Sequence, residues 1–202
     1  LASSGYRSGG WNRTGFSGVT ESSPYATDTL WNYELGIRSS WLDSRLTANV
    51  TGFYIDWTDI QLRVYEAGCL CSRTQNSGKA ESKGLEAEVR YQTTENLSLS
   101  ANYGYADATL AEDVRDATVS RAVIAATGDT LPGSSKNVFS LAADWQMPLT
   151  SSLDIQVNAS YSYVSSRPVG LGTAVVGQSG PDNLPSYELV NLSVGIGHGS
   201  GL

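Results

Sequence analysis

The residue types that most often carry chemistry are scarce in this sequence, and their spacing restricts what they can do. Two cysteines, Cys69 and Cys71, are separated by one residue, which is too close for a relaxed disulfide. The only histidine, His198, lies far from both in a glycine-rich tail, so a cysteine–histidine metal site is not indicated. We interpret the cysteines as a loop feature and His198 as a solvent-exposed tail residue.

Acidic residues form two small groups, and neither has the spacing of a known catalytic or calcium site. Asp56 and Asp59 are three positions apart, which on a strand places their side chains on opposite faces. Glu112, Asp113 and Asp116 lack the regular spacing of a calcium-binding loop. Phosphate-binding loops, dinucleotide-binding glycine patterns and nucleophile elbows are also missing. The sequence therefore indicates no enzyme, no metal site and no bound cofactor.

Arginine and aromatic residues, in contrast, gather in the segments between the predicted strands. Guanidinium groups pair with oxyanions and stack with aromatic rings, so these segments favour recognition of an anionic, ring-bearing ligand. Stacking on sugars is an alternative that the residue types leave open. The residues that we single out as candidates for ligand contact are Trp11, Arg13, Arg73, Arg115, Arg121 and Arg167.

The composition of the 202-residue chain narrows the class of protein. A net charge of −7 argues against a nucleic-acid partner, because a phosphate backbone selects basic surfaces. No apolar run reaches the length of about 18 residues that a transmembrane helix needs. The chain starts in mid-pattern without methionine, so we expect a piece of a longer protein.

Hydrophobic and polar residues alternate along most of the chain, and a period of two predicts β-strands. The clearest case is the segment 84–108, where two alternating stretches flank the turn QTTENL and predict a hairpin. The segment 110–127 is the one candidate for a short helix. The predicted strands are about 1–7, 30–41, 45–60, 83–93, 97–109, 137–147, 153–165 and 187–197.

Short and long connections alternate between these strands. The short turns WLDSRL, QTTENL and MPLTSSL all lie at one end of the predicted sheet. Long loops are uncommon in compact soluble domains, whereas outer-membrane barrels combine short periplasmic turns with long extracellular loops. The long segments, which are rich in Gly, Ser, Asp and Pro, span about 8–29, 66–82, 110–136 and 166–186.

One face of the predicted strands carries Leu, Val, Ile and Ala, with Tyr and Trp at both ends. Two aromatic girdles around an apolar band are typical of the lipid-facing surface of a membrane barrel. The opposite face is polar and suits an aqueous or plugged lumen. The predicted girdle residues are Trp31, Tyr33, Trp41, Tyr54, Tyr91, Tyr103, Tyr105, Trp145, Tyr161 and Tyr163.

The stretch GFYIDWTDIQ departs from this pattern, because Phe53, Ile55 and Trp57 lie on the polar face. Either a bulge shifts the register there, or the strand has left the bilayer and protein covers both faces. These two explanations remain open from the sequence.

The fold class that fits best is an all-β, antiparallel, up-and-down transmembrane β-barrel of which this chain forms about eight strands. A passive porin-like barrel without a plug would share the girdles and the loop asymmetry. A soluble β-sheet module, for example one that binds carbohydrate, would instead bury the aromatic residues in its core.

Five segments resemble TonB-dependent outer-membrane receptors. GYRSGGWN (5–12) is similar to the family segment GxxSGGFN, and residues 31–61 resemble YELGxKSxxLDxRLxxNxxxFYxDYxDIQ. Residues 80–108 resemble the hairpin KGxExExxxxPxxxLxLxxxxGYxDA. The stretches 131–149 and 184–196 fit the two segments that follow. The resemblance covers nearly the whole chain, and its motifs occur in the family order.

The resemblance implies a barrel of about 22 strands whose lumen holds an N-terminal plug. It implies a location in the outer membrane, contact with lipid, and an extracellular small-molecule ligand such as a ferric siderophore. It further implies energy supplied by the TonB complex through the plug. We therefore expect residues 1–202 to be part of the barrel domain, without plug or closing strands, and not to form a working barrel alone.

Overall fold

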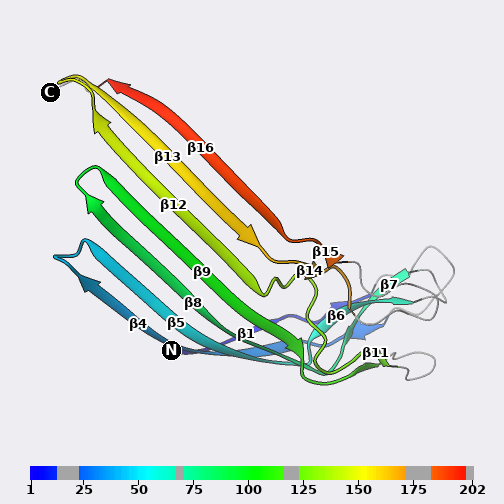
Figure 1. Cartoon of the computed structure of the whole chain (residues 1–202). Coiled ribbons are helices and arrows are strands. Elements are labelled where there is room, and N and C mark those ends of the chain that lie inside the picture. Colours follow the sequence, from blue (N-terminus) through cyan, green and yellow to red (C-terminus); the bar gives the residue numbers. More distant parts are fainter. Residues whose placement is uncertain (13–22, 67–70, 116–122, 172–182, 199–202) are drawn as a thin grey trace.

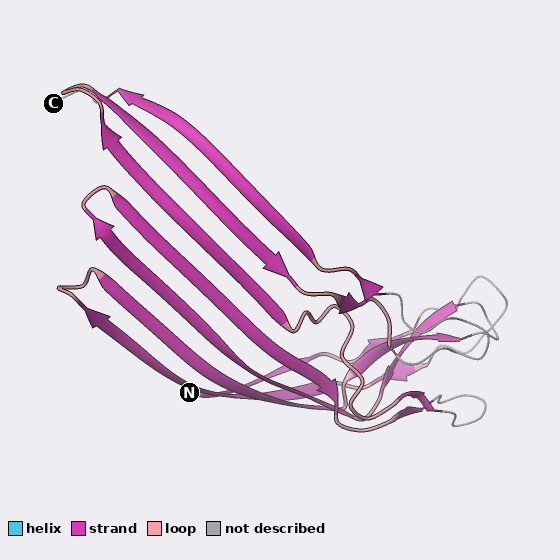
Figure 2. Cartoon of the chain, viewed as in Figure 1, coloured by secondary structure: helices cyan, strands magenta, loops and turns pink. Residues whose placement is uncertain are grey.

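The computed structural model describes residues 1–12, 23–66, 71–115, 123–171 and 183–198. These residues form strands, turns and irregular segments, which confirms the predicted all-β class (Figure 2). In the part of the chain that the structure describes, no helix is long and apolar enough to cross a membrane.

Eight long strands form one antiparallel sheet, in which each strand pairs with the next long strand along the chain (Figure 1). This order confirms the predicted up-and-down arrangement. The sheet is open, with β1 at one edge and β16 at the other. Its strands are β1 (Ala2–Arg7), β4 (Asp28–Trp41), β5 (Leu46–Thr58), β8 (Lys79–Thr94), β9 (Leu97–Leu110), β12 (Asn137–Pro148), β13 (Leu153–Val164) and β16 (Tyr187–His198).

Three short turns lie at one end of the sheet and are linked to neighbouring strands. The first turn has positive φ at three consecutive residues, 42–44, which reverses the chain tightly between β4 and β5. Next to it, the Arg45 Nε donates to the Gln92 carbonyl at 3.0 Å. In the same way, the Gln146 N–H donates to the Asn96 carbonyl at 2.8 Å. The turns therefore form one ordered edge.

Four two-stranded ribbons extend from the other end of the sheet (Figure 1). Seven of their eight strands lie inside the long segments between the predicted strands, and β6 (Gln61–Glu66) lies just before the segment 66–82. The segment proposed for a short helix, 110–127, contains none in its described part, because two of its stretches pair as strands. The ribbons are β2 (Gly10–Trp11) with β3 (Pro24–Tyr25), β6 (Gln61–Glu66) with β7 (Cys71–Asn76), β10 (Val114–Arg115) with β11 (Val123–Ala125), and β14 (Arg167–Pro168) with β15 (Asn183–Leu184).

One face of the sheet, which we call the outer face, is apolar and exposed over its central part. Leu35 is 82% exposed, Ile37 71% and Leu192 70%. A contiguous apolar surface of this kind is rare on a soluble monomer and marks contact with lipid or with another chain.

All ten predicted girdle residues lie on the outer face, as the strand register shows. Trp41, Tyr91 and Trp145 lie near the turns, and the other seven lie nearer the ribbons. Two of those seven, Trp31 and Tyr33, stack with their ring centroids 6.2 Å apart. Tyr33 and Trp41 are eight residues apart on β4. Eight residues of strand span about 27 Å, close to the height of a bilayer core.

The opposite face, which we call the inner face, carries polar side chains that are hydrogen-bonded between neighbouring strands. The Asn49 amide of β5 donates to Glu88 of β8 at 3.3 Å. The Asn102 amide of β9 donates to the Ser140 hydroxyl of β12 at 3.2 Å. Paired strand positions place both side chains on one face, so these contacts run across the sheet rather than along it.

The register of β5 explains why Phe53, Ile55 and Trp57 break the alternation. β5 pairs without interruption with both β4 and β8, so no bulge shifts it. The three side chains therefore lie on the inner face. The remaining explanation is that this part of β5 has left the bilayer.

Gly84 of β8 lies under the ring of Phe53. A Cβ atom at Gly84 would lie 2.5 Å from Cζ of Phe53 and 2.0 Å from the Tyr105 carbonyl oxygen. Glycine is therefore required by the close approach of ring and backbone. The glycine of the KGxE motif thus has a packing role in this sheet.

Candidate ligand-binding rim

The two faces of the sheet exchange polarity where the ribbons begin, a region that we call the rim. Strand β8 shows the change most clearly. Its outer-face positions pass from Leu85 to Lys83 and Glu81, while its inner-face positions pass from Glu86 to Ala80. Between this point and the short turns, the apolar side chains face outward. Between this point and the ribbons, they face the inside of the curved wall.

A small hydrophobic cluster, the rim core, lies on the inner face at this end. Leu110 and Val114 are each 1% exposed, and Trp57 packs against the cluster from β5. Burial of apolar surface holds the ribbons onto the end of the sheet. The rim core consists of Ile60, Leu62, Ala80, Leu110, Val114 and Ala125.

Two asparagines join ribbon β2/β3 to ribbon β6/β7. The Asn12 amide nitrogen donates to the Thr74 carbonyl at 2.7 Å, and its amide oxygen accepts from the Thr74 N–H at 2.8 Å. Asn76 makes the same pair of bonds with Ala26, at 2.9 Å and 2.6 Å. Each asparagine amide thus pairs with the backbone N–H and C=O of one residue, as a neighbouring strand would.

Further hydrogen bonds continue this connection around the rim. The Gln75 amide of β7 donates to the Arg115 carbonyl of β10 at 2.9 Å. Beyond β11, the Gly133 N–H donates to the Pro168 carbonyl of β14 at 2.8 Å. The first three ribbons are therefore linked in the order in which they follow along the chain, and β14 is bonded to the segment that follows β11.

Asp113 links the two strands at the base of the β10/β11 ribbon, because it precedes β10 and bonds to Thr127, which follows β11. Its carboxylate accepts from the backbone N–H and the hydroxyl of Thr127, each at 3.0 Å, and pairs with Arg115 at 3.2 Å. The hydrogen bonds from Thr127 lower the pKa of Asp113, and the charge of Arg115 lowers it further. Asp113 is thus a hydrogen-bond acceptor and ion-pair partner within this ribbon.

The most constrained ion pair of the rim was not predicted from the sequence. Asp28 is 1% exposed and pairs with Arg7, whose Nε donates to it at 2.9 Å. The Gln61 N–H donates to the same carboxylate at 3.1 Å, and the Arg7 guanidinium lies 4.7 Å from the Trp57 ring centroid. Burial raises the pKa of Asp28, but the hydrogen bonds and charge of Arg7 and Gln61 outweigh it and lower the pKa overall.

The ion pair between Arg7 and Asp28 could be predicted from the sequence only if the register of their two strands were known. Arg7 and Asp28 occupy directly opposite positions on β1 and β4. This register depends on a connection of 20 residues, between positions 8 and 27, that the sequence does not determine.

The structure places four of the six predicted ligand-contact residues on the ribbons. Trp11 of β2 is 68% exposed, and its neighbour Asn12 bonds to β7, which carries Arg73. Arg115 follows on β10, adjacent to β7. Arg167 belongs to β14, on the far side of the 131–134 segment. Arg13 and Arg121 lie outside the described residues.

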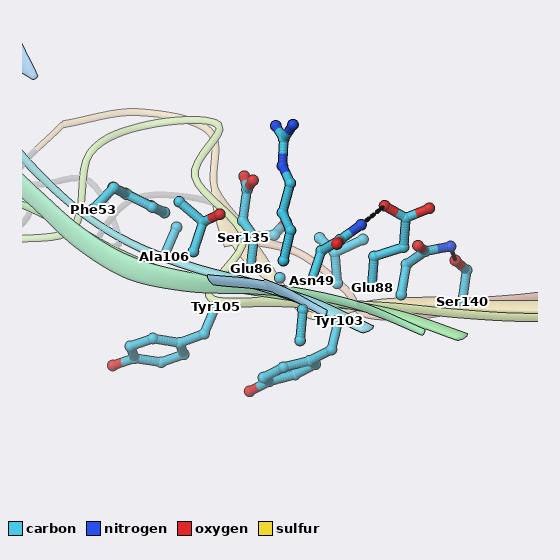
Figure 3. A pocket seen from close by; sticks show the side chains of 15 residues that line it. Asn49, Phe53, Glu86, Glu88, Tyr103, Tyr105, Ala106, Ser135 and Ser140 are labelled. Carbon is cyan, nitrogen blue, oxygen red and sulfur yellow. Dashed lines mark hydrogen bonds between the residues drawn. The ribbon is translucent and has the colours of Figure 1, made fainter. Parts of the chain in front are cut away.

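A hollow on the inner face lies below the rim. It is lined by polar side chains of the sheet, including Arg38, Asn49 and Glu88, and closed toward the rim by Phe53. Figure 3 shows Asn49, Glu88 and Phe53 on one side of the sheet and Tyr103 with Tyr105 on the other. The hollow, of about 670 Å³, therefore opens toward the lumen side of the wall.

The other described residues that the sequence analysis considered for chemistry lie on strands or at strand ends. Asp59 has a positive φ of 54° and ends β5 in a bend, away from Asp56 on the strand. His198 is the last residue of β16, opposite Leu153, so its backbone belongs to a strand and not to a glycine-rich tail. Cys71 begins β7, while Cys69 and Asp116 lie outside the described residues. Across the described residues, no group of three or more acidic, histidine or cysteine side chains could hold a metal ion.

Comparison with known families decides the class of protein. The family model described as "TonB dependent receptor-like, beta-barrel" matches residues 2–200. The chain belongs to the TonB-dependent receptor β-barrel family. Members of this family are transport receptors of the bacterial outer membrane, and the resemblance seen in the sequence motifs is thereby confirmed.

A curated relative is the ferric-pyoverdine receptor PbuA of Pseudomonas sp. (strain M114), 36% identical over 90 residues. These residues make up 43% of this chain and 10% of that receptor. The chain thus matches only a small part of the receptor's length.

Solved structures share the fold at lower identity. The ferric yersiniabactin uptake receptor FyuA from Yersinia pestis has a TM-score of 0.71 and 18% identity, over 96% of this chain and 26% of FyuA. The copper transporter OprC has a TM-score of 0.61 and 18% identity, over 84% of this chain and 23% of OprC. The chain is therefore similar to about a quarter of the length of each of these proteins.

Proposed function

We propose that this chain forms part of the wall of an outer-membrane receptor that takes up a ferric siderophore by TonB-dependent active transport. The observation that carries the proposal is the exchange of polarity between the faces of β8, combined with family membership. The likeness to a ferric-pyoverdine receptor supports iron chelates as the cargo.

In this proposal the outer face contacts lipid between the two rows of aromatic side chains. Tyr and Trp suit the membrane interface because each has an apolar body and a polar tip. Directly opposite Tyr54, the outer face carries Lys83, which pairs with Glu81 at 3.8 Å. Ionic groups at this height belong to the headgroup level and not to the hydrocarbon core.

The rim would contact the ligand, and the inner hollow would face the plug through which TonB acts. Recognition at the rim needs no chemical step, so we propose a transporter rather than an enzyme. Trp11, Arg73, Arg115 and Arg167 are on the ordered ribbons that such a ligand would meet.

The test is uptake of iron by iron-starved cells with and without the full-length receptor. We expect loss of ⁵⁵Fe uptake from one siderophore in the deletion strain and its recovery from a plasmid copy. A TonB-deficient strain that carries the receptor should also fail to take up iron.

Two results would overturn the proposal. Uptake that persists without TonB would indicate a passive barrel. Unchanged iron uptake in the deletion strain, together with loss of copper or cobalamin uptake, would keep the transporter but change its cargo.

A further inference from the structure

The guanidinium of Arg7 is held rigidly at the inner side of the rim. Its Nε donates to Asp28 at 2.9 Å and 3.2 Å, and its Nη2 pairs with the same carboxylate and donates to the Gln61 carbonyl at 3.2 Å. Asp28 is itself fixed by the backbone N–H groups of Arg7 and Gln61, each at 3.1 Å. The orientation of the guanidinium plane is thus determined before any ligand binds.

Trp57 supports one face of this guanidinium. The Arg7 Cζ lies 4.7 Å from the ring centroid, and the indole packs against the buried rim core on its other side. Despite these contacts, 48% of the Arg7 side chain remains exposed. Among the described residues, no acceptor bonds to Nη1, so this nitrogen keeps a free N–H donor.

The inner face beside this pair is apolar, in contrast to the inner face lower in the sheet. Leu30 is the cross-strand partner of Trp57, and Ile55 and Phe53 follow on β5. All three are half-buried. In this region of the inner face, a fixed guanidinium lies beside apolar side chains. In the region of Asn49 and Glu88 the inner face is polar, and water or charged groups are the expected neighbours there.

Asp28 neutralises the charge of Arg7, so the pair has little net attraction for a simple anion. What remains is a planar cation with one covered face and a free N–H donor. Guanidinium groups stack on aromatic rings while donating hydrogen bonds in their own plane. A ligand that matches both properties has an aromatic ring with an oxygen substituent.

We propose that Arg7 and Trp57 form a binding subsite for the aryl-oxygen group, a catecholate or phenolate, of a ferric chelate. The ring of the ligand stacks on the face of the guanidinium opposite Trp57, and Nη1 donates to the ring oxygen. This assignment rests on the proposed function, since it names the chemical class of chelator that the receptor selects.

The experiment compares two ferric chelates on the full-length receptor in detergent by calorimetry. The probes are an iron(III) tricatecholate and an iron(III) trihydroxamate, which differ in whether an aryl ring carries the oxygen atoms. We expect the wild-type receptor to bind the catecholate at least tenfold more tightly. Arg7→Lys, which keeps the charge and loses the planar fork, should weaken catecholate binding about tenfold.

Further variants separate a binding role from a structural one. Trp57→Leu should also weaken catecholate binding about tenfold, whereas Trp57→Phe, which keeps a ring under the guanidinium, should stay within about threefold. Arg45→Lys, the same substitution at the opposite end of the sheet, is the matched control and should bind as wild type. Resistance of the rim to added protease shows that each variant is folded.

The outcomes distinguish the subsite from the proposed function. A receptor that binds neither chelate contradicts the subsite, and the iron-uptake test then decides the proposed function separately. A receptor that prefers the trihydroxamate, or whose catecholate affinity is the same in folded Arg7→Lys and Trp57→Leu variants, remains a siderophore receptor but has no such subsite. Loss of catecholate binding only in variants whose rim has become protease-sensitive assigns the pair a structural role and also overturns the subsite.

Discussion

The central sheet and the rim use the same strands but bury opposite faces. In the central sheet, Leu35 and Leu192 project outward and are largely exposed in the isolated chain, while Asn49 and Glu88 face inward. In the rim, Leu110 is buried on the inner face and charged side chains occupy the outer face.

The difference follows from the solvent that each region meets. Lipid surrounds the outer face of the central sheet, so apolar side chains are stable there without protein contacts. Water surrounds the rim on both sides, so its apolar side chains must be covered by the chain itself. The ribbons supply that cover. One continuous strand therefore carries two hydrophobic patterns, which meet at the row of Tyr33 and Tyr54.

The sharpest way to test the rim core is Leu110→Ala. Leu110 is 1% exposed, and removing a buried Leu side chain costs about 2–5 kcal/mol. We expect the ribbons to become sensitive to added protease in intact cells while the barrel stays assembled. Leu141→Ala, on the outer face, is the control and should have a much smaller effect. Equal sensitivity of the two variants would contradict the distinction between the regions.

The lipid-facing surface is tested by placing a charge on it. Leu141 lies on the outer face of β12, between Phe139 and Trp145. Arginine at the middle of the bilayer destabilises a barrel by about 2–4 kcal/mol, so Leu141→Arg should reduce the folded fraction seen as heat-modifiable mobility on gels. Ser140→Arg, one residue away on the inner face, should assemble normally. Reversed behaviour of the two variants would invert the assignment of the faces.

The boundary between the two regions is tested at Gly84. A methyl group there collides with Phe53 and with the Tyr105 carbonyl, and overpacking of this kind costs about 1–3 kcal/mol. Gly84→Ala should therefore lower the unfolding midpoint of the purified receptor in denaturant. Gly104→Ala is the matched control, because nothing lies within 4 Å of a Cβ atom there. If both variants lowered the unfolding midpoint equally, the cause would be the loss of glycine's backbone flexibility in a strand and not the contact with the Phe53 ring.

The smallest expected effect is the response of the rim to acid. The pKa of Asp28 in the folded protein lies below its ordinary value of 3.8, so its ion pair with Arg7 stabilises the rim above that pH. This contribution is lost only as the pH falls through the lowered pKa. Protease resistance of the rim should stay constant from neutral pH to about pH 5 and fall below about pH 4. Asp28→Asn should lower resistance at neutral pH and remove the acid-dependent step; an unchanged step would assign it to another group.

Much of the sheet could be predicted from the sequence because lipid-facing strands alternate strictly. All eight long strands and the three short turns lie where the alternation and the turn residues predict them, within a few residues. Three of the ribbons were missed because their strands are only two or three residues long, so Gly10, Trp11, Val114 and Arg115 carry no repeating pattern. Local pattern predicts strands reliably only where one environment extends over several residues.

The rim's contacts depend on distances along the chain that no local pattern encodes. Arg7 and Asp28 are 21 residues apart, Asn12 and Thr74 are 62 apart, and Gln75 and Arg115 are 40 apart. The sequence did identify Arg73 and Arg115 as candidates for ligand contact by residue type. It could not show that β7 and β10 are neighbours, since that follows from the pairing of β8 with β9 below them.

The sequence by itself determined the class of fold, the order of the strands and the face that carries the apolar and aromatic side chains, because each of these follows from a period of two and from turn chemistry. The tertiary structure decided which side Phe53, Ile55 and Trp57 occupy, where the apolar face changes sides, and that Arg7, Asp28 and Trp57 form one group. The physical reason is that cross-strand register, set jointly by turns and packing over the whole sheet, brings residues together that have no relation along the chain.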